Sequence, residues 1–385
     1  AFMKRLIITF GLLIIMGILA GCSGTSNILP PAELVEFKPT LKADEVWTKN
    51  IGDGSDDEYI YFAPVLQNDI VYTASYDGYV MAIDSHNGST IWTTELDDVY
   101  PSATPLVTKE HVYVGTLYGH LVKIDIRNGG KLWQKEVPSS VFAAPVAAND
   151  LIVVNTWNGE VSAYKNSSGD LVWSQVVGSP PLMLTGNGSP VLSGNGQVYV
   201  GMDNGELWAF DVETGVKQWD VPIAVPEGGS DVSRMVDIVG TPVLEDGIIY
   251  VVTYQGNVAA VNSNNGAIVW KKEMSSYDSV AVGYSALYVT DSDSYIYSFD
   301  KSTGVQRWEQ KVLEGRSVTA PAIVGNYIVV SDFEGYVHFF NQRDGKYVAR
   351  VKVGGDGISS QAVVSGDRVY IQTNNGTLAA LQINS

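Results

Sequence analysis

Residues 82–92, AIDSHNGSTIW, decide the fold of this chain of 385 residues. A short alternating run ends at Asn87-Gly88, a pair that favours the tight turn of a β-hairpin because its backbone needs positive φ. Four residues after Gly88, Trp92 stands in the following run. The same arrangement recurs in AFDVETGVKQW (209–219) and SFDKSTGVQRW (298–308).

The glycine-to-tryptophan step extends through the chain at intervals of about 40 to 50 residues. It occurs at Gly88/Trp92, Gly129/Trp133, Gly169/Trp173, Gly215/Trp219, Gly266/Trp270 and Gly304/Trp308, and Ala349 replaces the tryptophan after Gly345. Periods of this length are typical of propeller blades or solenoids. Each unit holds four short runs with the two-residue period of strands, in the first unit roughly 62–66, 70–75, 79–84 and 90–95. Four antiparallel strands form one propeller blade.

The two ends of the chain predict the number of blades. Seven complete units occupy about 60 to 350, and an eighth, from about 358 onward, lacks one strand. Residues 44–48, DEVWT, read like the missing strand and carry Trp47. We therefore expect an all-β, eight-bladed β-propeller of four-stranded antiparallel blades over residues 44–385, closed by the N-terminal strand pairing with the last blade.

The repeated tryptophans are interpreted as structural. An indole on the outer strand can pack over the neighbouring blade and remove about 200 Å² from water. The predicted docking residues are Trp47, Trp92, Trp133, Trp173, Trp219, Trp270 and Trp308.

Composition excludes several functions. With 24 basic against 42 acidic residues, the net charge of −18 disfavours nucleic acid as a partner. A single cysteine excludes an internal disulfide and a CxxC zinc site. The four histidines show no metal-ligand spacing, and no nucleophile, phosphate-loop or dinucleotide motif occurs, so neither a metal site nor a catalytic residue is predicted.

The first residues have the pattern of a targeting segment. Residues 1–2 look like an expression scar, and 3–21 like a signal peptide whose apolar run is too short for a membrane span. The run ends in LAGC (19–22), which resembles the lipobox of bacterial lipoproteins. That resemblance implies a covalent lipid on Cys22, and Ser23 after it implies the outer membrane. A plain secretory signal is the alternative. Residues 22–43, with three prolines, are expected to form a lipidated flexible leash.

The repeat strings resemble the tryptophan-docking repeat of pyrroloquinoline-quinone (PQQ) enzymes over about 320 residues, and differ from WD40 repeats. A PQQ-dependent quinoprotein dehydrogenase is therefore one alternative. Members of that class usually carry an adjacent Cys-Cys disulfide and a calcium cage, and this chain has neither the disulfide nor EF-hand spacing at residues 56–58 or at Asp291 and Asp293.

The chain as a whole resembles the BamB family, lipoproteins of the β-barrel assembly (Bam) machinery. This resemblance implies a non-enzymatic scaffold without a cofactor, lipid-anchored at the periplasmic face of the outer membrane. The implied partners are the periplasmic POTRA domains of BamA, other Bam lipoproteins indirectly, and unfolded outer-membrane protein clients. A generic periplasmic binding module, with Trp157 and Tyr118 as stacking residues for sugars, also stays open.

Two long connections are the best candidates for a partner site. They lie between Trp173 and Pro190 and between Trp219 and Pro242, and each joins the outer strand of one blade to the inner strand of the next, so both should emerge on one face. The first contains PPLMLTG (180–186), whose consecutive apolar residues favour an exposed protein contact. The second contains EGGSDVSRMVD (227–237).

The family resemblance carries contact roles to particular positions. BamB proteins have a Leu-x-Leu-Arg segment in the first connection and an Asp-x-Asp segment in the second. Leu182 and Leu184 match the leucines and Asp237 the first aspartate, whereas Thr185 and Val239 depart from the pattern. The predicted partner-binding residues are Leu182, Met183, Leu184, Thr185, Arg234 and Asp237. Alternatively, the leucines fold back as a plug, and Arg234 and Asp237 make only local hydrogen bonds.

Overall fold

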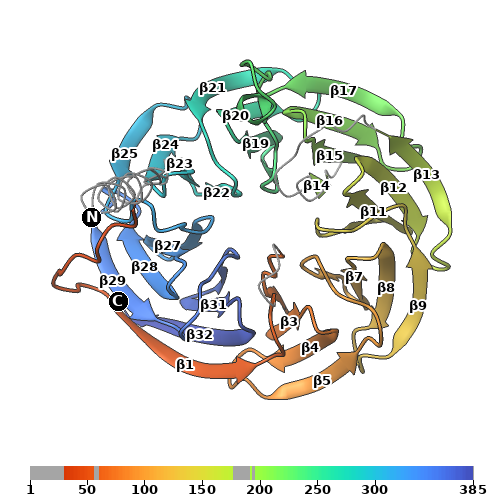
Figure 1. The fold of residues 1–385 in the computed structure, drawn as a ribbon, viewed down its shortest axis with the longest axis horizontal. Helices are drawn as coiled ribbons and strands as arrows, with labels where there is room; N and C mark the ends of the chain where they lie inside the picture. The colour runs from red at the N-terminus through yellow and green to blue at the C-terminus, as the bar shows by residue number, and fades with distance from the viewer. Residues whose placement is uncertain (1–29, 56–59, 177–190, 193–195, 385) are drawn as a thin grey trace, which may run out of the picture.

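The chain forms a closed ring of eight sheets, each with four antiparallel strands (Figure 1). The computed structural model describes residues 30–55, 60–176, 191–192 and 196–384. The prediction of an all-β, eight-bladed propeller is confirmed. None of the helical structure among these residues is long and apolar enough to span a membrane.

Blades 1 to 4 follow the chain in order, from the inner to the outer strand. They comprise β2 (Val65–Gln67), β3 (Ile70–Ala74), β4 (Tyr79–Asp84) and β5 (Thr90–Glu95); β6 (Leu106–Val107), β7 (His111–Gly115), β8 (His120–Asp125) and β9 (Lys131–Glu136); β10 (Val146–Ala148), β11 (Leu151–Thr156), β12 (Glu160–Lys165) and β13 (Leu171–Val176); and β14 (Val191–Leu192), β15 (Gln197–Gly201), β16 (Glu206–Asp211) and β17 (Lys217–Pro222).

Blades 5 to 7 repeat this order, and blade 8 combines both ends of the chain. They comprise β18 (Val243–Glu245), β19 (Ile248–Val252), β20 (Gly256–Asn262) and β21 (Ile268–Met274); β22 (Ala281–Val282), β23 (Ala286–Thr290), β24 (Ile296–Asp300) and β25 (Gln306–Gln310); β26 (Ala322–Val324), β27 (Tyr327–Ser331), β28 (Tyr336–Asn341) and β29 (Tyr347–Lys352); and β30 (Val363–Ser365), β31 (Arg368–Gln372), β32 (Thr377–Asn384) and β1 (Lys42–Asn50).

The ring is closed by the pairing of the two chain ends, as predicted. Strand β1 runs antiparallel to β32, with Lys42 opposite Asn384 and Asn50 opposite Thr377. A bulge between Glu45 and Trp47 interrupts the register. Because every blade then has four strands, the ring has no open junction of the kind that would template aggregation.

Each repeat tryptophan joins its blade to the next. The indole Nε1 donates to a backbone carbonyl of the following blade: Trp47 to Ser85 at 3.0 Å, Trp92 to Ile126 at 2.8 Å, Trp133 to Asn166 at 3.2 Å, Trp173 to Val212 at 2.8 Å, Trp219 to Ser263 at 3.2 Å, Trp270 to Lys301 at 2.9 Å and Trp308 to Gln342 at 2.9 Å. Six of the seven indoles lie against the glycine of the accepting turn. A Cβ on Gly215 would stand 2.5 Å from the ring of Trp173, for example, so a side chain there would displace the indole.

The junction between blades 7 and 8 lacks this arrangement for a structural reason. In blades 1 to 7 the indole-accepting turn links the third and fourth strands, but in blade 8 these strands are β32 and β1, the two ends of the chain. No such turn exists there, and Ala349 instead packs into an apolar cluster with Leu41 and Ala362.

The predicted flexible leash is wrong for residues 30–41, which are bound to the ring. The amides of Thr40 and Leu41 donate to the carbonyl of Val348 at 3.0 and 3.2 Å, and the ring of Phe37 stacks on Tyr347 with centroids 4.2 Å apart. The prolines and missing alternation hid a segment that binds through scattered apolar side chains. We call residues 30–41 the N-terminal strap; residues 22–29 lie outside the described part of the chain.

Candidate partner-binding face

One face of the ring carries all the connections between successive blades. Because the strands alternate in direction, these connections and the turns between the second and third strands of each blade emerge together. We call this the connector face, and the opposite side, with the remaining hairpins and the indole-accepting turns, the turn face. The connector face is built on a repeated backbone bond from turn to connection, such as Leu117 N–H to the Tyr100 carbonyl and Trp157 N–H to the Ser140 carbonyl, both 2.9 Å.

The contact residues predicted in the first long connection, Leu182, Met183, Leu184 and Thr185, lie outside the described residues, as does Cys22. The strands that flank this connection, β13 and β14, are described and end on the connector face. The placement of the connection's two ends therefore agrees with the expected face, while the residues' own role stays a prediction.

The second long connection runs from β17 to β18 and contains the 3₁₀ turn η1 (Val232–Arg234). The structure separates the two residues predicted to bind a partner here. Arg234 is exposed, but Asp237 is fully buried, at 0% of its surface. Asp237 therefore cannot meet a partner where it stands, and its predicted contact role is wrong for this conformation.

Packing of the segment around Asp237 explains its burial. Ile238 is buried, its amide donates to the carbonyl of Met202 at 3.1 Å, and its side chain occupies the space that a Cβ on Gly201 would need. The Asp237 carbonyl accepts from the Tyr254 amide at 2.9 Å. Residues 235–238 are thus part of the ring, and residues 225–234 form the exposed half of the connection.

The exposed half presents two apolar residues that sequence reasoning missed, Val225 and Val232, with 63% and 61% of their surfaces exposed. Both stand in a segment otherwise rich in glycine, serine and acidic residues. An isolated valine in such a segment has few apolar neighbours in sequence to pack against. This pattern could have predicted that both valines are exposed. With Arg234, Glu227 and Asp231 of the same segment they give the connection an exposed apolar and charged tip suited to a protein partner.

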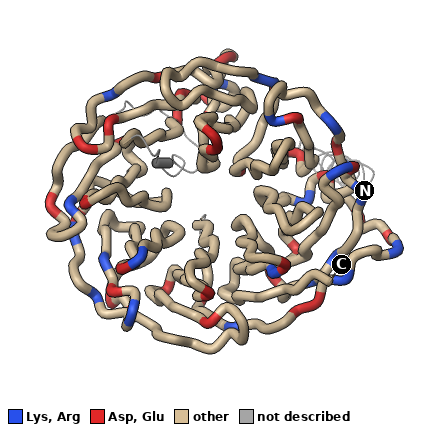
Figure 2. Tube along the Cα trace, turned by 180° about the vertical axis from the view of Figure 1, so that it is seen from behind, with Lys and Arg blue, Asp and Glu red and all other residues tan. Residues whose placement is uncertain are grey.

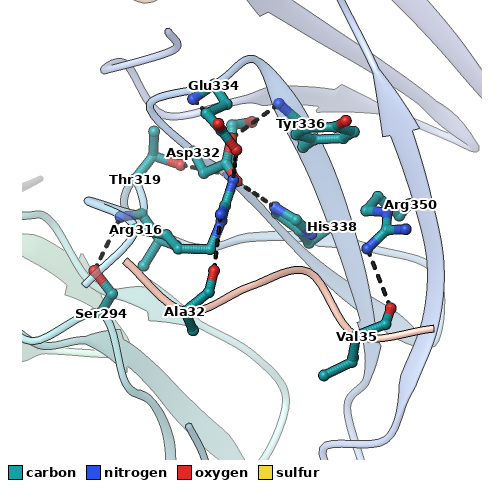
Figure 3. A network of polar contacts seen from close by, with 12 residues as sticks. Ala32, Val35, Ser294, Arg316, Thr319, Asp332, Glu334, Tyr336, His338 and Arg350 are labelled. Carbon is teal, nitrogen blue, oxygen red and sulfur yellow. Dashed lines mark hydrogen bonds and ion pairs between the residues drawn. The ribbon is translucent and has the colours of Figure 1, made fainter. Parts of the chain in front are cut away.

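A buried polar cluster holds the N-terminal strap on the connector face at blades 6 and 7 (Figure 3). The buried Arg316 donates from Nε to Asp332 at 2.7 Å, from Nη1 to the carbonyl of Ala32 at 3.0 Å, and from Nη2 to Glu334. On the far side of Asp332, His338 Nε2 stands 2.9 Å from the same carboxylate oxygen. Arg350 adds a bond of 3.3 Å to the carbonyl of Val35.

Protonation in this cluster follows from its burial. Burial lowers the pKa of His338 despite the opposing hydrogen bond and charge of Asp332. The neutral imidazole then donates from Nε2 to Asp332 and accepts at Nδ1 from the Tyr347 hydroxyl, which satisfies both nitrogens. Burial opposes ionisation of Asp332, but the hydrogen bonds from His338, the Tyr336 amide and Arg316 hold the pKa of that carboxyl below its ordinary value.

A cavity of about 990 Å³ opens at the centre of the ring, and it is the place to test for the cofactor of the quinoprotein alternative. Tyr61, Phe142 and Trp157 are among its apolar lining residues, and Asp278 and Asp291 supply carboxylates. Its described lining includes no lysine, arginine or histidine. PQQ is itself a polycarboxylate, so carboxylate walls without a cation do not fit it.

No group of three or more potential metal ligands gathers among the described residues. The structure thus adds no support to the quinoprotein alternative. What it presents instead is an exposed connection on a rigid ring.

The fold defines a class: an eight-bladed propeller of the PQQ-like repeat type. Its fold is similar to that of BamB from Moraxella catarrhalis, with a TM-score of 0.81, 24% identity, and coverage of 89% of this chain and 100% of that one. It is also similar to a europium-containing methanol dehydrogenase, with a TM-score of 0.73, 13% identity, and coverage of 88% and 93%. At these identities the likeness shows the fold alone.

Sequence comparison shows the family. The family described as outer membrane protein assembly factor BamB matches residues 40–133, 77–310 and 279–385. The chain is 36% identical to the outer membrane protein assembly factor BamB of Pseudomonas aeruginosa, covering 94% of this chain and 95% of that one, and 32% identical to its counterpart from Yersinia pestis, covering 96% and 97%. The chain belongs to the BamB family, a family of assembly factors and not of enzymes.

Proposed function

We propose that this protein is a lipid-anchored, non-enzymatic scaffold of the Bam machinery that binds the periplasmic POTRA domains of BamA through the two long connections of its connector face. Family membership supports the assembly role. The observation that carries the contact is the exposed tip of Val225, Val232 and Arg234 on a connection whose other half is fixed in the ring. A fixed base presents the tip with little ordering cost on binding.

Calorimetry tests this contact, with the full chain in detergent titrated by the POTRA domains of BamA. Leu182→Ala with Leu184→Ala should weaken binding by at least ~2 kcal/mol, as the loss of an interface hot spot does. Val232→Ser with Arg234→Ala should weaken it in the same direction. Tyr284→Ser is the matched control, because Tyr284 is 98% exposed on the turn face. Unchanged affinity for both connector-face variants, each shown to be folded, would reject the contact.

The anchor is tested separately. We propose that Cys22 carries the lipid and tethers the protein to the periplasmic face of the outer membrane. Two or more acyl chains hold a protein firmly, because each buried CH₂ contributes about 0.8 kcal/mol. Mass spectrometry of the N-terminal peptide should show the lipid mass on Cys22, and Cys22→Ser should move the protein from the outer-membrane fraction to the periplasm. An unmodified cysteine in the mature chain would contradict the anchor.

One observation favours a second role, the binding of extended client strands at the outer edge of the blades. The N-terminal strap itself lies along β29, where Thr40 and Leu41 bond to Val348. At the equivalent position before the tryptophan, Ile91, Leu132, Val172 and Val269 are exposed on the outer strands of other blades. An edge strand with exposed apolar side chains can accept a further strand by β-augmentation.

Site-specific crosslinking tests the client role. A photoreactive residue at position 132 or 172 should crosslink to newly exported outer-membrane proteins, while one at Arg127, on the turn face, should not. Clients found crosslinked to BamA but to neither outer-strand position would remove the support for this role.

A further inference from the structure

Six aromatic residues form a strip across the connector face of blades 1 to 3. They come from the connections and second turns of these blades: Tyr61, Tyr76, Tyr100, Tyr118, Phe142 and Trp157. Tyr118 and Tyr61 are the most exposed, at 66% and 46% of their surfaces. We call this set the aromatic strip. It is separate from the repeat tryptophans, which sit at the turn face and outer strands.

Five rings of the aromatic strip form two groups of contacting rings. Tyr76 and Tyr100 have centroids 5.3 Å apart, and Tyr118 meets Tyr100 edge-on at 5.5 Å. Phe142 and Trp157 meet at 5.3 Å with a steep angle between their planes. Leu117, which precedes Tyr118 in the chain, lines the central cavity with Tyr61, Phe142 and Trp157. The strip therefore leads from the surface of blade 2 into the mouth of the cavity.

Carboxylates alone supply charge beside the strip. Asp53, Asp77, Asp97 and Asp98 stand in the same connections and turns, and all but Asp77 are strongly exposed. In the described residues of these segments (51–55, 60–64, 75–78, 96–105, 116–119, 137–145 and 156–159) there is no lysine or arginine. Figure 2 shows many of the lysines and arginines along the outer rim of the ring.

The same face at blades 6 and 7 differs, because there Arg316 forms ion pairs with the carboxylates of Asp332 and Glu334. The turn face also differs, since its loops include basic residues such as Lys109 and Arg127. The described connector-face loops of blades 1 to 3 thus form an acidic, aromatic surface that holds no lysine or arginine of its own. A partner with positively charged side chains could therefore neutralise the negative charge of this surface.

We propose that the aromatic strip binds an extended, cationic polypeptide segment. Lysine or arginine side chains of this segment would lie over tyrosine rings and pair with the nearby aspartates, interactions that reinforce one another. Apolar side chains between them would enter the cavity mouth beside Phe142 and Trp157. Anionic lipid or nucleic acid would be repelled by the same carboxylates, and a neutral sugar could form no ion pair with them, only hydrogen bonds from its hydroxyls.

The inference does not depend on the proposed contact with BamA. Fluorescence anisotropy with the full chain in detergent tests it. The probe is a labelled twelve-residue peptide of four Lys-Leu-Ser repeats, and its matched partner carries glutamate in place of each lysine. The lysine peptide should bind, more weakly as salt rises, and the glutamate peptide should bind at least about tenfold more weakly.

Two pairs of variants locate the site. Tyr61→Ser with Tyr118→Ser should weaken binding of the lysine peptide about tenfold, and Asp97→Asn with Asp98→Asn should weaken it and flatten its salt dependence. Asparagine preserves the positive φ that Asp98 adopts. The controls are Tyr284→Ser and Asp69→Asn with Asp246→Asn on the turn face, where the two aspartates also have positive φ.

The outcomes separate the possibilities. Loss of binding in the strip variants with unchanged binding in the controls supports the inference. Equal loss in both sets, equal binding of the glutamate peptide, or binding of maltohexaose in place of the lysine peptide would overturn it. Circular dichroism of each variant confirms that the ring is folded, so a loss of binding reports on the surface. BamA affinity of the same variants, measured separately, shows whether the two contacts are independent.

Discussion

The two faces of the ring differ in what their residues do. The turn face repeats one device, a glycine turn that receives an indole from the preceding blade, and it does so at seven of the eight junctions. The connector face repeats only a backbone bond from turn to connection, and its side chains vary from aromatic strip to long connection to polar cluster. On the connector face the repeat constrains only the backbone, so the side chains there can vary and can take part in binding.

The comparison predicts that turn-face variants lose stability and connector-face variants lose binding. The largest expected effect is that of Trp173→Ala. It removes a buried indole and its bond to Val212, and should lower the free energy of unfolding by about 3–5 kcal/mol. The control is Trp157→Ala on the connector face, where the ring is partly exposed and the loss should be less than half as large. Denaturant titration measures both, and equal losses would erase the distinction.

The accepting glycine offers a second test at the same junction. Gly215 has a φ of +69°, and a Cβ there would collide with the ring of Trp173. Gly215→Ala should therefore cost about 2 kcal/mol through backbone strain and overpacking. Gly229→Ala is its control, because Gly229 lies in the exposed connection and a Cβ added there would meet no atom within 4 Å. Denaturant titration again measures both variants, and a harmless Gly215→Ala would show that the indole does not need the glycine.

Ala349→Trp tests why the junction between blades 7 and 8 has no indole. The repeat pattern alone suggests that restoring tryptophan would stabilise the ring. The structure predicts the opposite, a loss of about 1–3 kcal/mol, because blade 8 has no accepting turn and Ala349 is packed against Leu41 and Ala362. A higher melting temperature for this variant would contradict the explanation.

The polar cluster at blades 6 and 7 is the exception, because it gives the connector face a stabilising role, and it predicts a modest pH dependence. The pKa of His338 in the folded state lies below its ordinary value of 6.5. Below pH 6.5 the unfolded chain therefore binds a proton that the folded chain does not, and stability falls as pH falls. The loss should be about 1 kcal/mol per pH unit at first. His338→Gln should remove this part of the slope between pH 6.5 and 5; an unchanged slope would assign it to other groups.

The fold could be predicted because its signals are local and repeated. The glycine turn and the tryptophan lie four residues apart, so a blade can be recognised from a single stretch such as residues 82–92. Ring closure was predictable because β1 carries the same tryptophan signal as the other outer strands. The signals for these features lie within short stretches of sequence, and the structure confirms the fold and its closure.

The features that sequence reasoning missed depend on partners far away in the chain. The N-terminal strap reaches across the ring closure, where Arg316 binds the carbonyl of Ala32. Asp237 matches a contact position of the family by alignment, yet the packing of Ile238 on blade 4 buries it. No local pattern encodes either contact, which is why one segment was expected to be free and one residue to be exposed.

Hydrogen exchange of the full chain, alone and with the POTRA domains of BamA, tests most directly whether the connector face binds the partner while the turn face stabilises the ring. We predict slower exchange on the connector face around residues 225–234, with the turn-face hairpins at residues 84–89 and 125–130 unchanged. Protection confined to those hairpins, with residues 225–234 exchanging as before, would contradict the account.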